Sequence, residues 1–409
     1  MTLKKFLTIL LLVILVAGLI FFLYYLFILK PSGDSLNPFD NSPGDLFPFG
    51  NGGDGVEEGG EGGNDGGGGT TTDPGVGENF VYGRISDGPV SGANWINIST
   101  TTEDIYYVDR LSGNIFDYSI EKNSSARITN TTLPGLEKAV ISKSLSLIGQ
   151  KTYNSSVIDT FIAYIYKDNG EVLYPSSLES DTKLVALSPN KEMLVYVRNT
   201  TNGSAFYLVD LQTDALERIY SSKLQSFLIE WINDADLLIQ TKPSYLIEGV
   251  SFILNTETGV IKRLLGSKLA LLVRVSPSKN FTLYYEQTNL GDSGLYINNK
   301  KEGSSTKLSV YTLPEKCIFD KEETFLWCAV PSTVKKSGFP DNWYKGTISF
   351  DDRLVKVDLD DYSVTTYLNP TSIGEEVVDM TDISFNSDET FLFFTNKKDL
   401  TLWGLRLDN

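Results

Sequence analysis

The sequence predicts an all-β globular domain that follows an apolar N-terminal segment and a glycine-rich linker. From about residue 80 to 409 the chain consists of short runs rich in β-branched and aromatic residues, separated by turn residues, such as DIYYVD (104–109), MLVYVRN (193–199) and FTLYYEQ (281–287). No stretch of this region keeps a helical period over ten or more residues. The hydrophobic content of 41% is ordinary for a protein with a buried core.

The β runs repeat along the chain with a period of about 44 residues. Segments such as ALSPNKEMLVY and RVSPSKNFTLYY align on a shared turn position, and successive positions are 44, 44, 43 and 66 residues apart. The aligned positions are Ser188, Ile232, Ser276, Phe319 and Phe385, and extrapolation towards the N-terminus reaches Ser144 and Ser99. Four short strands per repeat of this length are typical of a β-propeller, in which ring closure removes the free sheet edges. We therefore predict a β-propeller of seven four-stranded blades over residues 80–409. Six or eight blades remain alternatives, because the first two units match loosely.

Two of the repeat units resemble a known family of propeller repeats. The segments LSPNKEMLVYV with FYLVDLQTDALERI, and VSPSKNFTLYY, are similar to TolB-like and WD-repeat-like repeats, whose consensus runs apolar-SPDGK-x-apolar-aromatic followed by apolar-Tyr-apolar-x-Asp-apolar-x-Thr-Gly. The resemblance covers roughly residues 180–409. The sequence lacks the Gly-His and Trp-Asp dipeptides of the WD pattern. The resemblance implies a platform that binds a protein or another ligand, without specifying which.

The N-terminal segment predicts a membrane anchor. Residues 6–29 are 24 residues without a charge, about 36 Å long as a helix, against a hydrocarbon core of about 30 Å. A cleavable signal peptide is the alternative, but it has a shorter apolar region and a small-residue cleavage site, and no A-x-A pattern follows here. Lys4 and Lys5 precede the run, so the positive-inside rule places residues 1–5 in the cytoplasm. We expect a single-pass signal-anchor helix in the lipid bilayer of the cell membrane, with the propeller outside the cytoplasm.

Residues 30–79 form the predicted linker between the anchor and the propeller. Residues 31–79 hold 16 of the 35 glycines and ten Asp or Glu, but neither Lys nor Arg. Such a composition cannot bury enough apolar surface to offset the entropy of ordering, so we expect a disordered acidic tether. Its root-mean-square reach is roughly 35 to 42 Å.

The composition excludes several classes of function. The chain has no histidine, and therefore no Ser-His-Asp or Cys-His nucleophile system and no His-ligated metal. Its formal charge of −17 argues against a nucleic-acid binder. The charge is concentrated in the linker, because residues 80–409 carry 42 acidic against 32 basic side chains. No catalytic residue, metal or cofactor is identified.

These observations favour a binding or scaffolding module of the cell envelope, with a protein or a polysaccharide as its partner, over an enzyme. The alternative is a carbohydrate-active or other enzyme that uses carboxylates from different blades in the channel. Asp, Glu, Arg and Tyr side chains that converge at one mouth of the channel would favour the enzyme. A channel mouth without such a cluster, or with an apolar lining, would favour the binding module.

The longest interval of the repeat contains an insertion, PSTVKKSGFPDNWYKGTISFDD (331–352). Long loops on a rigid scaffold often carry binding residues, and aromatic with charged side chains suit recognition of a protein or a sugar. The candidate binding residues are Phe339, Asp341, Trp343, Tyr344 and Lys345. The alternative is a local lid, in which the aromatic side chains pack back over the blade.

Two further patterns lie close to this insertion. Cys317 and Cys328 flank one turn and could form a disulfide outside the cytoplasm. Ideal cross-strand pairing would instead place Cys317 opposite Leu326, so the sequence leaves the disulfide open. The aspartates of residues 351–361 could gather a calcium ion, but the sequence VKVDLDDYS favours a strand that ends in an Asp-rich turn.

Overall fold

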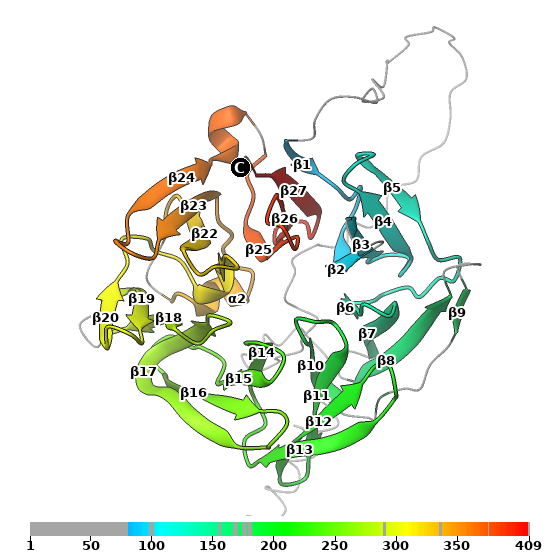
Figure 1. Cartoon of the computed structure of the whole chain (residues 1–409), viewed down its shortest axis with the longest axis horizontal. Coiled ribbons are helices and arrows are strands. Elements are labelled where there is room, and N and C mark those ends of the chain that lie inside the picture. The colour runs from blue at the N-terminus through cyan, green and yellow to red at the C-terminus, as the bar shows by residue number, and fades with distance from the viewer. Residues whose placement is uncertain are drawn as a thin grey trace, which may run out of the picture. The chain divides into compact units, whose positions relative to one another are not determined.

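The computed structural model describes residues 81–97, 102–153, 157–166, 171–173, 178, 182–288, 292–334, 338–374 and 376–407. These residues form seven four-stranded antiparallel blades around a central axis, which confirms the predicted all-β propeller (Figure 1). The apolar run 6–29 and the linker 30–79 lie outside the described residues. Within the ranges given above, no helix has the length and apolar character needed to cross a membrane.

Each blade has four strands, which we name A to D from the axis outwards. Blade 1 comprises β2 (Val90–Asn97), β3 (Glu103–Asp109), β4 (Ile115–Ser119) and β5 (Ser124–Arg127), and blade 2 comprises β6 (Lys138–Ile141), β7 (Ser146–Tyr153), β8 (Val157–Tyr166) and β9 (Glu171–Leu173). Blade 3 comprises β10 (Thr182–Leu187), β11 (Met193–Thr200), β12 (Gly203–Asp210) and β13 (Leu216–Ser222), and blade 4 comprises β14 (Leu228–Trp231), β15 (Asp236–Gln240), β16 (Glu248–Asn255) and the first part of β17 (Ile261–Val275).

The remaining blades follow the same order. Blade 5 comprises the second part of β17, β18 (Phe281–Gln287), β19 (Ser293–Asn299) and β20 (Ser304–Lys307), and blade 6 comprises β21 (Cys317–Phe319), β22 (Phe325–Pro331), β23 (Asp352–Asp358) and β24 (Val364–Leu368). Blade 7 comprises β25 (Met380–Phe385), β26 (Phe391–Asn396), β27 (Leu402–Arg406) and β1 (Tyr82–Arg84). The short helices are η3 (Pro314–Lys316), α2 (Asp341–Tyr344) and η4 (Pro370–Ile373).

The ring is closed by strands from opposite ends of the domain. Strand β1 pairs with β27, with Tyr82 opposite Leu405 and Arg84 opposite Trp403. The fourth strand of the last blade therefore comes from the start of the domain. Because β1 pairs along the outer side of β27, the edge of β27 is covered and blade 7 has four strands like the other blades.

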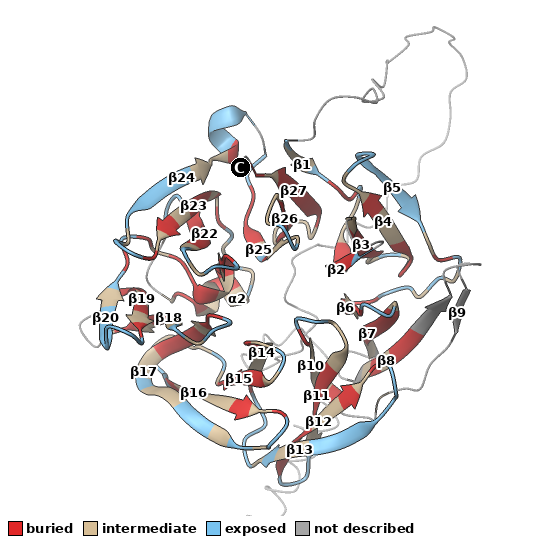
Figure 2. Ribbon diagram, in the orientation of Figure 1, coloured by how far each residue is buried: buried red, intermediate tan, exposed pale blue. Residues whose placement is uncertain are grey.

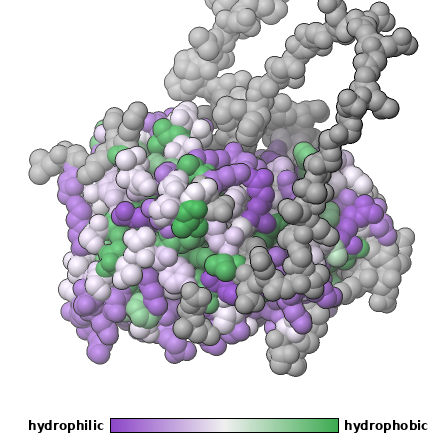
Figure 3. All heavy atoms as spheres, turned by 90° about the horizontal axis from the view of Figure 1, so that it is seen from above, coloured by the Kyte–Doolittle hydropathy of each residue, from purple (hydrophilic) through white to green (hydrophobic). Residues whose placement is uncertain are grey.

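Burial follows the order of the strands within each blade. Figure 2 shows buried residues on the inner strands and exposed residues on outer strands such as β5 and β13. Strands β15 and β26 are buried along their whole length. Figure 3 shows that apolar residues form small separate groups on the visible described surface, among many hydrophilic ones. The apolar core therefore lies between neighbouring blades, as the packing of a propeller requires.

The turns between strands A and B, which we call the AB turns, share one local structure. In four of them a side-chain oxygen accepts the backbone N–H of the residue five positions later, and the residue three positions later has a positive φ. The accepting residues are Ser188, Ser276, Asp320 and Asn386, and the positive-φ residues are Lys191, Lys279, Glu323 and Glu389. The sequence alignment on Phe319 and Phe385 was therefore wrong by one residue. The true spacing from Ser188 is 44, 44, 44 and 66, because the capping oxygen and not the apolar residue marks the turn.

Hydrogen bonds join the AB turns of neighbouring blades from blade 2 round to blade 1, and one further bond joins the A strands of blades 1 and 2. From blade 3 to blade 4 the bond is Asn190 N to Asp234 Oδ1 (3.0 Å), and from blade 4 to blade 5 it is Asn233 Nδ2 to the Pro277 carbonyl (3.0 Å). Ser278 N donates to Glu323 Oε1 of blade 6 (2.7 Å), and Lys321 N donates to Glu389 Oε1 of blade 7 (2.6 Å). Ser387 N of blade 7 donates to Glu103 Oε2 of blade 1 (2.7 Å). Lys143 N donates to the Lys191 carbonyl at 3.1 Å, and Asn94 Nδ2 donates to the Ile141 carbonyl at 2.8 Å. These contacts, which we call the AB ring, connect all seven blades at one face of the propeller.

Cys317 and Cys328 form a disulfide between strands β21 and β22. The two residues are directly opposite in the register, with Cα atoms 4.0 Å apart, and Leu326 is opposite Phe319 instead. The sequence-based pairing of Cys317 with Leu326 was therefore wrong. The connection between the strands is two residues longer than that pairing assumed, because it is the six-residue turn capped by Asp320.

Thiol titration tests the disulfide directly. The denatured, non-reduced full-length protein is expected to show no free thiol, because both cysteines are bonded and fully buried in the folded state. The same sample after reduction should give two thiols, which serves as the control. Two free thiols before reduction would contradict the disulfide.

Candidate functional site at the central channel

The insertion between β22 and β23 packs onto the propeller at the end of the channel opposite the AB turns. Figure 1 shows its helix α2 near the centre of the ring. Phe339 and Trp343 are only 1% and 3% exposed, and they pack with Tyr285 of β18 and Phe350 in one apolar cluster. The two aromatic side chains are therefore not available at the surface in this structure, as the lid alternative describes.

A buried ion cluster fastens the insertion to blades 6 and 7. Lys316 Nζ lies 2.6 Å from Asp352 Oδ2 and 2.6 Å from Asp379 Oδ1, and all three side chains are fully buried. Asp379 Oδ2 accepts hydrogen bonds from Trp343 Nε1 at 2.9 Å and from Phe350 N at 3.0 Å. The ammonium also lies 5.2 Å from the centre of the Trp343 ring. Lys316 of η3 thus links Asp352, the first residue of β23, to Asp379, which directly precedes β25, and Asp379 in turn holds Trp343 of the insertion.

Burial and charge act against each other in this cluster. Burial alone would lower the pKa of Lys316, but the carboxylates of Asp352 and Asp379 outweigh it and raise the pKa. Burial raises the pKa of Asp352 to about 6, although Lys316 opposes the shift. Removal of one partner from such a buried pair leaves an uncompensated charge, which typically costs about 3–5 kcal/mol. The cluster therefore holds the insertion in one specific position.

The other candidate residues of the insertion have different environments. Asp341 Oδ1 accepts the backbone N–H of Tyr245 at 2.8 Å, and Asp341 Oδ2 accepts the Ser244 hydroxyl at 3.0 Å. Asp341 thereby fixes the loop between β15 and β16. Tyr344 is half-buried, and burial with the nearby Glu315 carboxyl raises the pKa of its phenol well above the ordinary value. Lys345 is exposed.

Glu315 lies beside the insertion at the start of blade 6. Burial raises the pKa of its carboxyl to about 7, Tyr344 and Arg274 oppose the shift, and Asp382 adds to it. Arg274 Nη2 pairs with Glu230 Oε1 at 2.9 Å. Charged groups of neighbouring blades therefore surround Glu315, but Glu315 is not among the residues that line either cavity described below.

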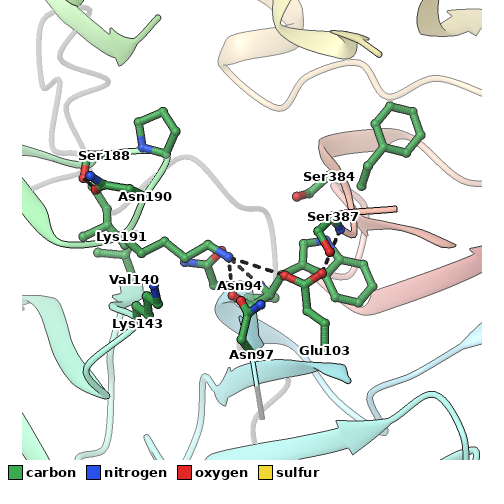
Figure 4. Close-up of a pocket in the computed structure, with 15 residues that line it drawn as sticks. Asn94, Asn97, Glu103, Val140, Lys143, Ser188, Asn190, Lys191, Ser384 and Ser387 are labelled. Carbon is green, nitrogen blue, oxygen red and sulfur yellow. Dashed lines mark hydrogen bonds and ion pairs between the residues drawn. The ribbon is translucent and has the colours of Figure 1, made fainter. Parts of the chain in front are cut away.

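A cavity of about 640 Å³ opens at the AB face, and we call it the mouth cavity (Figure 4). Its lining comes from blades 7, 1, 2 and 3: Ala93, Asn94, Trp95, Asn97, Glu103, Val140, Lys143, Leu187, Ser188, Pro189, Asn190, Lys191, Ser384, Phe385 and Ser387. A second cavity of about 620 Å³ lies at the opposite end and shares four of these residues, Ala93, Asn94, Val140 and Ser384. These four residues on β2, β6 and β25 therefore form the wall of the channel where the two cavities meet.

Lys191 reaches across the mouth cavity from blade 3 to blade 1. Figure 4 shows its side chain extended towards Asn94 and Glu103. The ammonium donates a hydrogen bond to the Trp95 carbonyl and lies 3.9 Å from Glu103 Oε1. Burial lowers the pKa of Lys191, and Glu103 opposes the shift. The other oxygen of Glu103 accepts the Ser387 N–H at 2.7 Å, so this carboxylate is held by blades 3 and 7.

The aspartates of residues 351–361 do not gather at one point. Asp352 begins β23 and Asp358 ends it, about 20 Å further along the strand. Asp358 and Asp361 accept N–H groups within their own turn, from Asp360 and Ser363. In the part of the chain that the structure describes, no group of three His, Cys, Asp or Glu side chains is placed to hold a metal ion.

Sequence reasoning did not identify the mouth cavity or the ion cluster. The contributing residues of the cluster, Lys316, Asp352 and Asp379, are far apart in the sequence and come together only through the blade order. The sequence indicated only weakly that Lys191 and Lys143 lie at the same face of the propeller, because each of them belongs to an aligned AB turn. Their convergence depends on which blades are neighbours, and a single repeat unit does not contain that information.

A comparison with a solved structure supports the fold. The chain is similar to the tricorn protease, with 10% identity, a TM-score of 0.50 and coverage of 81% of this chain and 34% of that one. It is also similar to an oligogalacturonate lyase in complex with manganese (9% identity, TM-score 0.49, 78% and 97% coverage) and to TolB from Acinetobacter baumannii (12%, 0.40, 78% and 80%). The protein is a β-propeller. At these identities the likeness shows the fold alone, and neither a protein-family model nor a curated protein matches the sequence.

Replacement of Trp343 tests the packing of the insertion. Trp343→Ala removes a buried indole and its hydrogen bond to Asp379, so the free energy of unfolding should fall by about 3–5 kcal/mol in chemical denaturation. Lys345→Ala, at an exposed position of the same segment, should change it by less than about 0.5 kcal/mol. An unchanged midpoint for Trp343→Ala would contradict the packed arrangement and favour a side chain that is free for a ligand.

The raised pKa of Glu315 predicts an unusual dependence of stability on pH. The carboxyl is protonated more readily in the folded than in the unfolded chain, so its contribution is complete below its ordinary pKa of 4.5 and is lost as the pH rises through about 7. Glu315→Gln stays neutral, and it should therefore be more stable than the wild type at pH 8, by up to about 3 kcal/mol, and equal to it near pH 4.5. Urea denaturation at both pH values measures this difference. A variant that is less stable than the wild type at pH 8 would contradict it.

Proposed function

We propose that the protein is a binding module that holds part of a protein partner in the mouth cavity of its propeller. The proposal includes the membrane anchor 6–29 and the acidic linker 30–79, which would present the propeller outside the cytoplasm. The amino-acid sequence is the support for this localisation, through the uncharged run of 24 residues and the lysines that precede it.

The observation that carries the proposal is the chemistry of the mouth cavity. Glycoside chemistry of the usual kind requires two carboxyl groups within about 10 Å of each other. Among the described lining residues, Glu103 is the one carboxylate, and both of its oxygens interact with groups of the protein. The other polar lining residues are serines, asparagines and lysines, which suit recognition better than acid–base catalysis.

The rigidity of the AB face supports a binding role. The AB ring fixes the turns that carry Asn190, Lys191 and Ser387 before any partner arrives. A preorganised site loses less conformational entropy on association than a mobile one. The volume of about 640 Å³ falls within the range of ligand pockets, roughly 300–1,000 Å³.

A cavity-filling variant tests the proposal in native membranes. Ser384→Trp places an indole at the wall between the two cavities, so chemical cross-linking followed by mass spectrometry should lose the partner that the wild type captures. Ser221→Trp on the exposed outer strand β13 is the matched control and should retain that partner. Circular dichroism should show the same strand content for both variants.

The opposite result would contradict this function. If Ser384→Trp folds and captures the same partner as the wild type, the channel wall is not part of the binding site. Ser387→Trp at the exposed rim of the mouth cavity provides a second variant, in case the channel does not accept the indole.

A further inference from the structure

We propose that the mouth cavity takes an acidic peptide segment of the partner, whose carboxylates pair with Lys143 and Lys191. This inference rests on the proposed function and deepens it, because it names the chemistry of the ligand. It is carried by the charge of the cavity, by the geometry of Lys191 and by the kinds of side chain in the lining.

The mouth cavity has the opposite charge to the domain that contains it. Residues 80–409 carry more acidic than basic side chains, 42 against 32. The described lining has two lysines and one carboxylate, so it is locally positive. Lys143 lies at the rim with 55% of its side chain exposed and is 3.8 Å from Glu192, which is not among the lining residues. A negatively charged ligand therefore meets an attractive site on an acidic surface, and like charge around the site disfavours other orientations.

The ammonium of Lys191 can pair with an anion at a shorter distance than its present distance to Glu103. It has three donors, and one of them goes to the Trp95 carbonyl. Its distance of 3.9 Å to Glu103 is longer than the 2.7–2.9 Å of a direct charged hydrogen bond. A ligand carboxylate that enters the cavity can therefore make a shorter contact than Glu103 makes, without removing the bond to Trp95.

The uncharged lining suits a peptide better than a sugar. Side-chain amides of Asn97 and Asn190 and the hydroxyls of Ser384 and Ser387 can bond the N–H and carbonyl groups of an extended backbone. Trp95 is 2% exposed and packs on Phe391 and Phe393. Phe385 is partly exposed and makes a T-shaped contact with Trp327. The indole of Trp95 is therefore not available for a pyranose ring to stack on.

Fluorescence anisotropy with a labelled peptide of alternating Glu and Gly tests the ligand class on the full-length protein. The peptide should bind more weakly as salt is raised from 50 to 300 mM, and a peptide of alternating Gln and Gly should not bind. Lys143→Gln should weaken binding about tenfold, and Lys143→Arg should restore most of it. Lys191→Gln should weaken binding at least as much, and Lys143→Gln carries the test if the Lys191 variant does not fold.

The chain offers a matched control for Lys143. Lys321 occupies the same position in the AB turn of blade 6, one residue after the capping Asp320, and it is exposed but does not line the cavity. Lys321→Gln should leave binding unchanged. Equal affinities for Lys143→Gln and Lys321→Gln would overturn the proposal, and so would equal binding of the Gln peptide. Tighter binding of a uronic acid oligosaccharide than of the Glu peptide would also overturn it.

The cross-linking experiment separates this inference from the proposed function. If partner capture is lost in Ser384→Trp but retained in Lys143→Gln, the cavity binds the partner and the acidic-peptide chemistry is wrong. If capture is retained in both variants, the proposed function itself is wrong.

Discussion

The whole domain depends on the closure of the ring by the pairing of β1 with β27. A propeller blade buries its faces only against its neighbours, so a gap at one place would expose the faces of two blades to water. Three opposed residue pairs, from Tyr82 with Leu405 to Arg84 with Trp403, close this gap. The AB ring adds a second closure at one face, and it passes through the same junction, where Ser387 of blade 7 donates to Glu103 of blade 1.

The two ends of the channel are built from different physical chemistry. At one end Lys316, Asp352 and Asp379 exclude water, and their charges are compensated by each other and by Trp343. Such a cluster gives one defined arrangement at the cost of desolvation. At the AB face the charged groups keep contact with solvent, and the cavity between them is open. The ion cluster holds the insertion on blades 6 and 7, and the mouth cavity is the place where we propose that a partner is recognised.

The sequence was sufficient for the architecture because the repeat is local. Blades 1 to 6 are each continuous in the sequence, and four of the described AB turns carry the same capping oxygen, so the spacing predicted seven blades. The alignment was wrong by one residue at Phe319 and Phe385 because it matched the apolar residue of each turn. The residue that defines the turn is the next one, Asp320 or Asn386, whose side-chain oxygen caps it. The disulfide remained open for the same reason, since the length of that capped turn sets the register.

The site could be predicted only in part, because it is made of contacts between units. The 331–352 insertion was recognisable by its length, but the burial of Phe339 and Trp343 depends on apolar surface that blade 5 supplies. Aromatic residues in a long loop suit a binding surface and a packed lid equally well, and only the neighbouring blade decides between them. The mouth cavity is a stronger example, since its lining spans four blades.

The closure also determines how the domain would respond to mechanical load. Residues before 81 enter the domain through β1, and the carbonyl of Val81 accepts the N–H of Arg406. A pull along the chain from its N-terminal side therefore acts first on the short β1–β27 pairing rather than on any complete blade. Strand β1, which closes the ring, is therefore also the strand expected to detach first under load. Its detachment would open the propeller between blades 7 and 1, beside the wall of the mouth cavity.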